Sequence, residues 1–372
     1  MTQEKLRGGY TTGSSATAGM KAALLALLQD EYVRQVRIQN PQGQQIEVPV
    51  EDVEILSSQV ARAVVIKDGG DDPDVTHGTQ IVTTVELTPT GGLQFKAGTG
   101  VGVVTKPGLS LAPGEPAINP GPRAMMKLVY DEFSTQLGTS SQGLIVTVSV
   151  PEGLELAKKT LNETLGIEGG ISIIGTTGIV KPMSEEGFKN SLVPQLQVMK
   201  AHGFHTAVLV PGRIGRDLGA KQLGIGEDQM AETSNFIGFM LEQCVAQGFN
   251  DILIIGHIGK IVKLASGSFH THNRMSDGRI ETLVAYAALE GASKQVAQEI
   301  MDCATTEAVM PILARENLTA VYQRVAQRAA LRSKRYIKGE ADVGIIIANL
   351  DGTILALDTH AKTIVEREGW HI

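Results

Sequence analysis

The sequence is poor in aromatic residues and in cysteine. Phe, Tyr and Trp make up 4% of the 372 residues, and the two cysteines are Cys244 and Cys303. Two cysteines cannot build a disulfide framework, and neither lies in a zinc-type cluster. No apolar run approaches the ~18 residues of a membrane span, and the first residues lack the apolar region of a signal peptide. These absences predict a cytoplasmic protein and exclude a disulfide scaffold or a membrane-embedded chain.

Blocks of basic residues are also lacking. The formal net charge is −7, so we expect neither nucleic acid nor an anionic membrane as partner. A small molecule is the expected partner, and a homo-oligomer is compatible with the sequence. Glycine, in contrast, is abundant, with 42 residues that show no collagen-like period. This excess indicates tight turns, or backbone that closes around a ligand.

The rhythm of predicted elements changes near Gly169. The first half mixes helices and strands without regular alternation, and its segment 88–122 is predicted to be ordered loop. The second half alternates short apolar strands with helices, which is typical of a parallel sheet covered on both faces. We predict an α+β domain over 1–168, followed over 169–372 by an α/β domain with a small, mainly parallel sheet. The principal helices are predicted at 14–29, 120–137, 154–165, 184–202 and 235–247, and the strands at 33–39, 46–50, 60–67, 80–87, 143–150, 171–174, 206–210, 251–255, 342–348 and 353–358.

Three glycine-bearing loops follow apolar strands of the second half, at 175–178, 211–213 and 256–260. In an open α/β sheet, ligands bind beyond the carboxyl ends of the strands, where glycines let backbone N–H groups approach. A helix N-terminus at the same place favours anionic groups. We predict that the three loops form one ligand site, although each alone is equally compatible with a plain strand-to-helix turn. Residues 98–102 resemble a fragment of GxGxxG but lack its third glycine and the preceding βαβ strand.

The first half holds the densest polar cluster, KDGGDDPDVTHG at 67–78, with four carboxylates and one histidine. Asp-rich loops can ligate hard cations, but this spacing is not that of an EF-hand, and Asp also forms turns. A metal site, a ligand-contacting loop and turn chemistry all stay open. His270 and His272 would face one side of an extended segment and could bind a metal. No third ligand lies close to them in the sequence.

Several long strings together resemble one protein family. They are LRGGYTTGS at 6–14, the polar cluster at 67–78, GTGVGVVTKPGL at 98–109, GEPAINPGPR at 114–123, and the segments 159–186 and 256–267. The ensemble resembles the cobalt-precorrin-5B C(1)-methyltransferases of the anaerobic cobalamin pathway. The match runs from about residue 6 to beyond residue 277 and is weaker after that. Ser15 stands where this family commonly carries cysteine, so we expect no essential thiol there.

The resemblance implies methyl transfer from S-adenosylmethionine to carbon 1 of a ring-contracted tetrapyrrole, giving cobalt-precorrin-6A. Cobalt would enter only as part of the substrate, and the chain itself is expected to hold no metal. The enzyme would align a sulfonium methyl with the carbon nucleophile and exclude water. The many carboxylates of the substrate predict Arg and Lys in its pocket. The alternative is a non-catalytic tetrapyrrole-binding or carrier protein of the same pathway.

Because aromatics are scarce, both ligands would be held mainly by backbone, Thr, Asp and basic groups. We expect the first domain to bind the tetrapyrrole and the second to bind the cofactor. Asp68 and His77 are the residues expected to take a proton, if the substrate must lose one. The expected substrate-binding residues are Arg7, Thr11, Thr12, Ser14, Lys67, Asp71, Asp72, Thr76 and Arg123. The expected cofactor-binding residues are Gly175, Thr176, Thr177, Gly178, Gly212, Gly256, His257, Gly259 and Lys260.

Overall fold

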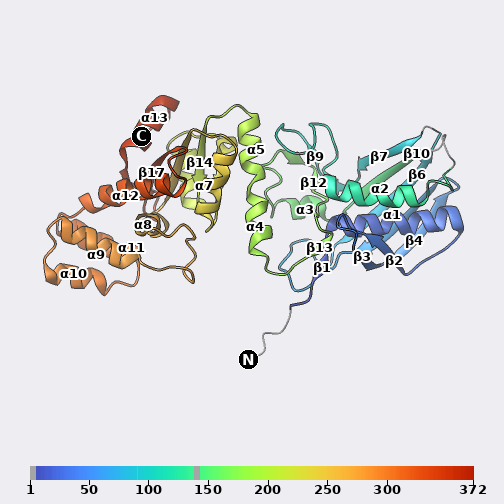
Figure 1. The fold of residues 1–372 in the computed structure, drawn as a ribbon, viewed down its shortest axis with the longest axis horizontal. Helices are drawn as coiled ribbons and strands as arrows, with labels where there is room; N and C mark the ends of the chain where they lie inside the picture. The colour runs from blue at the N-terminus through green and yellow to red at the C-terminus, as the bar shows by residue number, and fades with distance from the viewer. Residues whose placement is uncertain (1–5, 90, 138–142) are drawn as a thin grey trace. The chain divides into compact units, whose positions relative to one another are not determined.

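The structure is a computed structural model that describes residues 6–89, 91–137 and 143–372. Its chain divides into two compact units, Met1–Glu185 and Glu186–Ile372, shown from blue to green and from green to red in Figure 1. The first unit is α+β, and the second is α/β with a mainly parallel sheet, so the predicted fold class is confirmed. The stretch 169–185 packs with the first unit, whereas the sequence assigned it to the second.

A five-stranded sheet and a long helix form the core of the first unit. The sheet has the order β4-β5-β6-β10-β7, antiparallel except where β10 pairs with β7. Helix α1 packs on β5 and β6, and its alanines let the helix lie close to the sheet. The strands are β4 (Asp52–Ser57), β5 (Val60–Ile66), β6 (Gln80–Thr88), β7 (Gly92–Ala97) and β10 (Gly143–Ser149). Beside them lie α1 (Thr12–Gln29), α2 (Pro120–Glu132) and the hairpin of β2 (Gln35–Gln39) and β3 (Gln45–Pro49).

Three pairs of two-residue strands explain why 169–185 belongs to the first unit. Each pair joins the segment 167–180 to an earlier part of that unit, so this segment cannot open the parallel sheet as predicted. The pairs are β1 (Gly9–Tyr10) with β13 (Ile179–Val180), β8 (Gly100–Val101) with β12 (Gly170–Ile171), and β9 (Val103–Val104) with β11 (Ile167–Glu168). The predicted loop 88–122 therefore contains β7, β8 and β9, and the helix predicted over 154–165 is only α3 (Gly153–Ala157).

The second unit has one sheet of order β15-β14-β16-β17-β18, parallel except for the last pair. Its central strands are almost entirely buried and apolar, as expected for a sheet covered on both faces. The strands are β14 (Thr206–Val210), β15 (Met230–Glu232), β16 (Asp251–His257), β17 (Asp342–Ala348) and β18 (Ile354–Leu357). The helices are α4 (Glu185–Leu192), α5 (Pro194–Ala201), α6 (Arg213–Lys221), α7 (Ile237–Ala246), α8 (Ile258–Ser266), α9 (Arg279–Leu289), α10 (Lys294–Met301), α11 (Thr306–Arg315), α12 (Ala320–Tyr336) and α13 (Thr359–Glu368).

One predicted helix, over 184–202, is two helices in the structure. α4 ends at Leu192, and α5 begins at Pro194 in its first turn. Proline has no N–H to donate and clashes with the preceding turn, but it fits the first position of a helix. The break therefore falls where the sequence places its only proline of that stretch.

Many glycines of the first unit allow backbone segments to touch one another. A Cβ added to Gly9 would overlap the carbonyl oxygen of Asp68, and one added to Gly70 would overlap that of Arg7. The expectation that these loops close around ligands therefore needs correction, since at these positions the glycine is required by the chain's own packing. Gly78 and Gly114 differ, because a Cβ at either would meet nothing within 4 Å.

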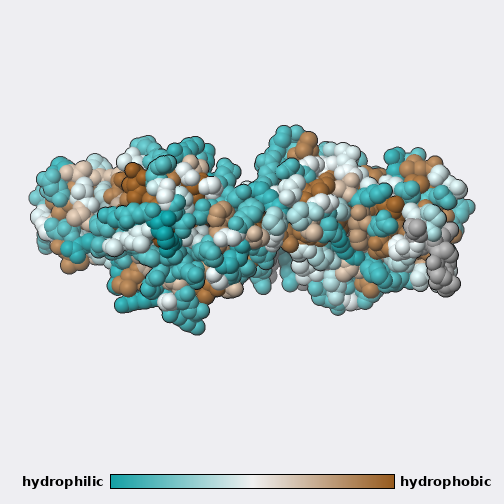
Figure 2. Space-filling view, turned by 90° about the horizontal axis from the view of Figure 1, so that it is seen from above, coloured by the Kyte–Doolittle hydropathy of each residue, from teal (hydrophilic) through white to brown (hydrophobic). Residues whose placement is uncertain are grey.

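The surface carries no large apolar area on the face shown in Figure 2. Hydrophilic residues cover most of that face on each unit, and hydrophobic residues gather in small, separate groups. Scattered groups of this size are normal for a folded domain. Among the described helices, none combines the length and the apolar character that crossing a bilayer would require.

Candidate functional site

Lys67 and Asp74 form a buried ion pair inside the polar loop of the first unit. The Nζ of Lys67 lies 2.6 Å from Oδ2 of Asp74, and the Lys67 side chain is 1% exposed. The other oxygen of Asp74 accepts hydrogen bonds from the N–H of Thr76 (2.8 Å) and from its hydroxyl (2.6 Å). Burial alone raises the pKa of Asp74, but the bonds from Lys67 and Thr76 outweigh burial and lower it. Lys67 and Thr76, both predicted to bind substrate, thus hold the loop together.

Arg7 and Asp68 form the exposed side of the same loop. The guanidinium of Arg7 donates to both carboxylate oxygens of Asp68, one of them at 2.8 Å. The backbone N–H of Arg7 donates to Asp71 (2.5 Å), so the segment before β1 is bonded to the polar loop. The bonds from Arg7 lower the pKa of Asp68 from 3.8 to about 2. A carboxylate of that pKa is a weak base at neutral pH, which disfavours the predicted proton-accepting role of Asp68.

His77 keeps one ring nitrogen available. Its Nδ1 accepts the N–H of Gly69 at 3.0 Å, so the neutral ring carries its proton on Nε2. The side chain is 52% exposed, and its Nδ1 lies 3.7 Å from Asp68. Among the described residues, no hydrogen bond to Nε2 of His77 is found. The structure therefore brings Arg7, Asp68, Asp71 and His77 together on one loop.

Replacing Arg7 with Met is expected to lower stability in a pH-dependent way. The folded pKa of Asp68 is depressed to about 2, so the stabilisation by Arg7 is present above the unfolded pKa of about 3.9. It is lost as the pH falls through about 2. The difference in unfolding free energy between wild type and Arg7→Met, measured by urea titration, should therefore shrink as the pH is lowered from about 4 to 2.

Arg34→Met is the matched control for this measurement. Arg34 donates to the backbone oxygen of Glu51 at 2.7 Å, an acceptor that does not titrate. Its loss should change stability by the same amount at every pH. A difference for Arg7→Met that stays constant over this range would show that Arg7 does not act through Asp68.

The predicted cofactor loop 175–178 lies against the start of α1. The hydroxyl of Ser14 donates to the carbonyl of Gly178 (2.7 Å), and Thr12 Oγ1 accepts the N–H of Ile174 (2.9 Å). A Cβ added to Gly175 would overlap Oγ1 of Thr11, which also caps α1 by accepting the N–H of Ser14. The predicted substrate residues Thr11, Thr12 and Ser14 are thus the packing partners of this loop.

The β2–β3 hairpin donates to two further carbonyls of the same loop. Asn40 donates to the carbonyl of Thr177 (2.8 Å), and Gln42 donates to that of Thr176 (3.2 Å). The loop therefore lies in the first unit, and the prediction that it belongs to the second domain is corrected. The physical reason is the pairing of β12 and β13 with strands of the first unit.

Arg123 and Asp72 also make internal contacts. Arg123 donates to the carbonyl of Ile118 (2.7 Å) and to Glu115 (2.8 Å), and its guanidinium lies 5.4 Å from the ring centre of Phe95. Asp72 accepts the N–H of Met183 at 2.8 Å. Both side chains were predicted to bind substrate, but here each fixes a loop of the first unit.

The second unit has a topological switch point between β14 and β16. The order β15-β14-β16-β17 is that of doubly wound sheets, which bind ligands where the strand order reverses. β14 ends at Val210 and β16 at His257, so Gly212 and the segment 257–260 follow neighbouring strands at the carboxyl edge. Two of the three glycine-bearing loops therefore lie at the same edge, and the third, at 175–178, does not.

Lys260 links the loops at this edge. Its ammonium donates to the carbonyl oxygens of Pro211, after β14, and of Ser234 (3.1 Å), after β15. Ser234 has φ of 51°, which is rare for a residue with a side chain and shows that this turn is held firmly. Burial lowers the pKa of Lys260, while the charge of Glu232 raises it. Lys260 thus organises three loops, a role closer to positioning than to the predicted contact with a cofactor.

His257 pairs with a residue that sequence reasoning missed. Its Nδ1 accepts the N–H of Gly259 (3.1 Å), so the neutral ring donates from Nε2 to Glu307, 2.6 Å away. Glu307 lies in the first turn of α11, about 50 positions later in the chain, and no local motif announces it. Gly259 lies against this ring, since a Cβ there would contact its Nδ1 at 3.0 Å, whereas a Cβ on Gly256 would meet Pro211.

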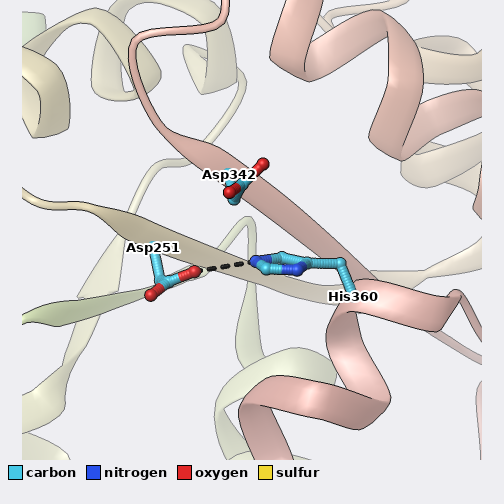
Figure 3. A group of neighbouring side chains, drawn as sticks. All are labelled: Asp251, Asp342 and His360. Atoms are coloured by element: carbon cyan, nitrogen blue, oxygen red, sulfur yellow. Dashed lines mark hydrogen bonds and ion pairs between the residues drawn. The ribbon is translucent and has the colours of Figure 1, made fainter.

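The described part of the chain brings three potential metal ligands together at one place, Asp251, Asp342 and His360. Figure 3 shows their side chains at the amino ends of β16 and β17, the edge opposite to the switch point. Nε2 of His360 lies 2.7 Å from Asp251, whose second oxygen pairs with Arg367 at 2.8 Å, and Lys334 pairs with Asp342. Arg367 and Lys334 already pair with the two carboxylates, so the group is explained as an ion-pair network to which His360 adds a hydrogen bond.

His270 and His272, which the sequence offers as possible metal ligands, lie in a row of stacked rings. The ring of His270 lies 4.9 Å from that of Phe236 with an interplanar angle of 21°. His272 lies 6.4 Å from His270, at the same angle. The loop that carries them is anchored by the buried Lys263, whose Nζ donates to the carbonyl of Thr271 at 2.9 Å.

The chain thus has an α+β unit that presents a polar loop and a doubly wound α/β unit with a topological switch point at its carboxyl edge. Comparison with known proteins identifies the family. The model named CbiD matches residues 1–182, and the model of the CbiD C-terminal domain matches residues 270–359. The chain belongs to the CbiD family.

Two similar proteins align with nearly the whole chain. A cobalt-precorrin-5B C(1)-methyltransferase from Moorella thermoacetica is 44% identical over 368 residues, covering 99% of each chain. Another of that name, from Methanocaldococcus jannaschii, is 43% identical over 360 residues, covering 95% of this chain and 96% of the relative. A crystal structure of the cobalamin biosynthesis protein (cbiD) from Archaeoglobus fulgidus is 29% identical, covers 74% of this chain and 84% of that one, and aligns with a TM-score of 0.39.

Proposed function

We propose that this chain transfers a methyl group from S-adenosylmethionine to carbon 1 of cobalt-precorrin-5B, giving cobalt-precorrin-6A in cobalamin biosynthesis. The observation that carries the proposal is the 44% identity, over 99% of both chains, to a relative that bears this activity in its name. The identity extends over the residues of both units, so neither unit lies outside the match.

The methyl donor is assigned to the carboxyl edge of the second unit. Gly212 supports this, because a Cβ at that position would meet nothing within 4 Å, so the turn after β14 is open. Gly256, His257, Gly259 and Lys260 form the neighbouring loop at the switch point. The loop 175–178 is left out of the donor site, because the carbonyls of Thr176, Thr177 and Gly178 accept hydrogen bonds from the first unit and Gly175 packs against Thr11.

The tetrapyrrole is assigned to the polar loop of the first unit. Arg7 and His77 present exposed side chains there, 59% and 52% exposed. Positive and N–H-bearing groups suit the acetate and propionate carboxylates of such a substrate. Lys67, Thr76 and Arg123 are framework residues in this proposal, because their polar atoms bond to the protein.

Bound S-adenosylmethionine supplies an electrophilic methyl group on a sulfonium sulfur. The chain's own work is to hold the donor and the carbon nucleophile in line and to keep water out. Lys260 serves this by fixing the loops after β14 and β15, and the His257–Glu307 pair by fixing the start of α8. His77 presents its Nε2–H as a donor to a substrate carboxylate, since its Nδ1 already accepts the N–H of Gly69, and Asp68 is held ionised by Arg7.

Incubation of the purified chain with cobalt-precorrin-5B and methyl-labelled S-adenosylmethionine tests the proposal. We expect one labelled methyl group in the tetrapyrrole for each S-adenosylhomocysteine formed, detected by mass spectrometry and by NMR of the product. A carrier protein would bind the tetrapyrrole but form no S-adenosylhomocysteine. That result, from a chain shown to be folded, would overturn the proposal.

A further inference from the structure

The segment β14–α6–β15 repeats the spacing of a nucleoside-binding βαβ unit. β14 ends at Val210, the turn carries Gly212, and α6 carries Gly215 in its first turn. A Cβ on Gly215 would overlap the carbonyl oxygen of Ile255, so this glycine lets α6 pack directly on β16. An open glycine at the turn and a packing glycine three residues later are two of the three glycine roles in dinucleotide-binding turns.

The acidic residue of such a unit follows about 20 positions after the turn glycine, at the end of the next strand. Here that residue is Glu232, the last residue of β15, which pairs with Val210 at the end of β14. In the classes of protein that use this arrangement, the carboxylate accepts hydrogen bonds from ribose hydroxyls. Glu232 thus stands at the position where a ribose is recognised.

Glu232 is held firmly, yet its carboxylate has no bonded partner among the described residues. The buried Gln195 accepts the N–H of Glu232 (2.8 Å) and donates to its carbonyl (3.3 Å). The negative charge of Glu232 raises the pKa of Lys260, but no ion pair between the two side chains is found among the described residues. A fixed carboxylate with both oxygens free suits the two adjacent hydroxyls of a ribose.

A flat surface follows directly after Glu232. Phe236 stacks on His270, and the loop 269–271 is pinned to this turn by hydrogen bonds from Gly238 to Phe269 (3.0 Å) and from Thr271 to Asn235 (2.9 Å). Phe236 and His270 are both partly exposed. In a chain with so few aromatics, a rigid stacked pair beside an unbonded carboxylate is a suitable platform for a purine.

We infer that the β14–α6–β15 segment binds the adenosine part of the methyl donor, with Glu232 accepting the ribose hydroxyls and the Phe236–His270 pair beside the adenine. Gly212 leaves room for the part of the donor between ribose and methyl group. The inference rests on the proposed use of S-adenosylmethionine and adds the residues that recognise it.

Isothermal titration with S-adenosylhomocysteine and with its 2′-deoxy analogue tests this inference. Wild type should bind the ribose form more tightly, since the deoxy analogue lacks one hydroxyl. Glu232→Gln should weaken binding of the ribose form by about 10–100-fold, the usual worth of hydrogen bonds to a charged group. It should also abolish most of the preference over the deoxy analogue, which a merely structural role of Glu232 would not do.

Matched variants keep the result interpretable. Gly212→Ala should bind more weakly with an unchanged thermal unfolding midpoint, because its methyl group enters open space. Gly226→Ala, also in open space, and Glu227→Gln, which is exposed on the same unit, should bind as wild type does. Unchanged affinity and unchanged preference in Glu232→Gln would overturn the inference while leaving the proposed function standing. Failure of wild type to bind S-adenosylhomocysteine at all would instead overturn the proposed function.

Discussion

Asp74→Ala is expected to destabilise the first unit by about 3–5 kcal/mol, because it leaves the ammonium of Lys67 buried without its partner. Lys67 is 1% exposed and lies 2.6 Å from Asp74. The same substitution removes the acceptor of the N–H and hydroxyl of Thr76. Urea unfolding followed by far-ultraviolet circular dichroism measures the loss.

A double variant separates the buried charge from the lost packing. Lys67→Met removes the ammonium while keeping most of the side-chain length, so Lys67→Met/Asp74→Ala should recover most of the stability lost in Asp74→Ala alone. Glu54→Ala is the control, since it breaks an exposed pair with Arg62 and should cost no more than about 1 kcal/mol. A double variant as unstable as Asp74→Ala would mean that the buried charge is not the cause.

This ion pair also shows why sequence reasoning assigned Lys67 to the substrate. A lysine inside an acidic, glycine-rich loop looks like a ligand-binding residue, and nothing local reveals that its chain turns inward. The carboxylate that neutralises it lies seven positions later in the same loop. Turn chemistry, one of the three interpretations left open for residues 67–78, accounts for Lys67, Asp74 and Thr76. The exposed side chain of His77 keeps the ligand-contacting interpretation open for the solvent-facing side of the loop.

The second unit was more predictable than the first, for a physical reason. A strand buried on both faces is a continuous apolar run, and β14 and β16 can be recognised from such runs alone. The two-residue strands β8, β9, β11 and β12 have no such signature, because their pairing is decided by contacts far along the chain. For the same reason, the first unit ends at Glu185 and not at residue 168 as predicted.

Within the candidate site, the spacing of Gly212 and Glu232 is a feature that the sequence alone displays. Gly212 and Glu232 have the spacing of a turn glycine and a ribose-binding acid, but Val210 stands where a complete GxGxxG string has its first glycine. Glu307 is different, since only the placement of α11 brings it to His257. Residues joined by tertiary structure alone could not have been found.

A second large loss of stability is expected from a substitution at Gly100, one of the glycines of the first unit. Its φ is 72°, a region that side chains rarely adopt, and an added Cβ would overlap the carbonyl oxygen of Val150. The carbonyl of Gly100 is in turn packed so closely that a Cβ on Gly153 or on Gly170 would overlap it. Three glycines therefore meet where β8, β12 and the start of α3 cross.

Gly100→Ala should destabilise the first unit by about 2–5 kcal/mol, the sum of about 1–2 for the left-handed backbone and about 1–3 for overpacking. Two companion variants separate the causes. Gly114→Ala has φ of 92° but open space around its Cβ, so it should show the backbone cost alone. Gly153→Ala has the overlap without the positive φ and should show the packing cost alone. If Gly100→Ala were no less stable than Gly114→Ala, the backbone crossing would be looser than described, and ligand contact would again be the better explanation for this glycine.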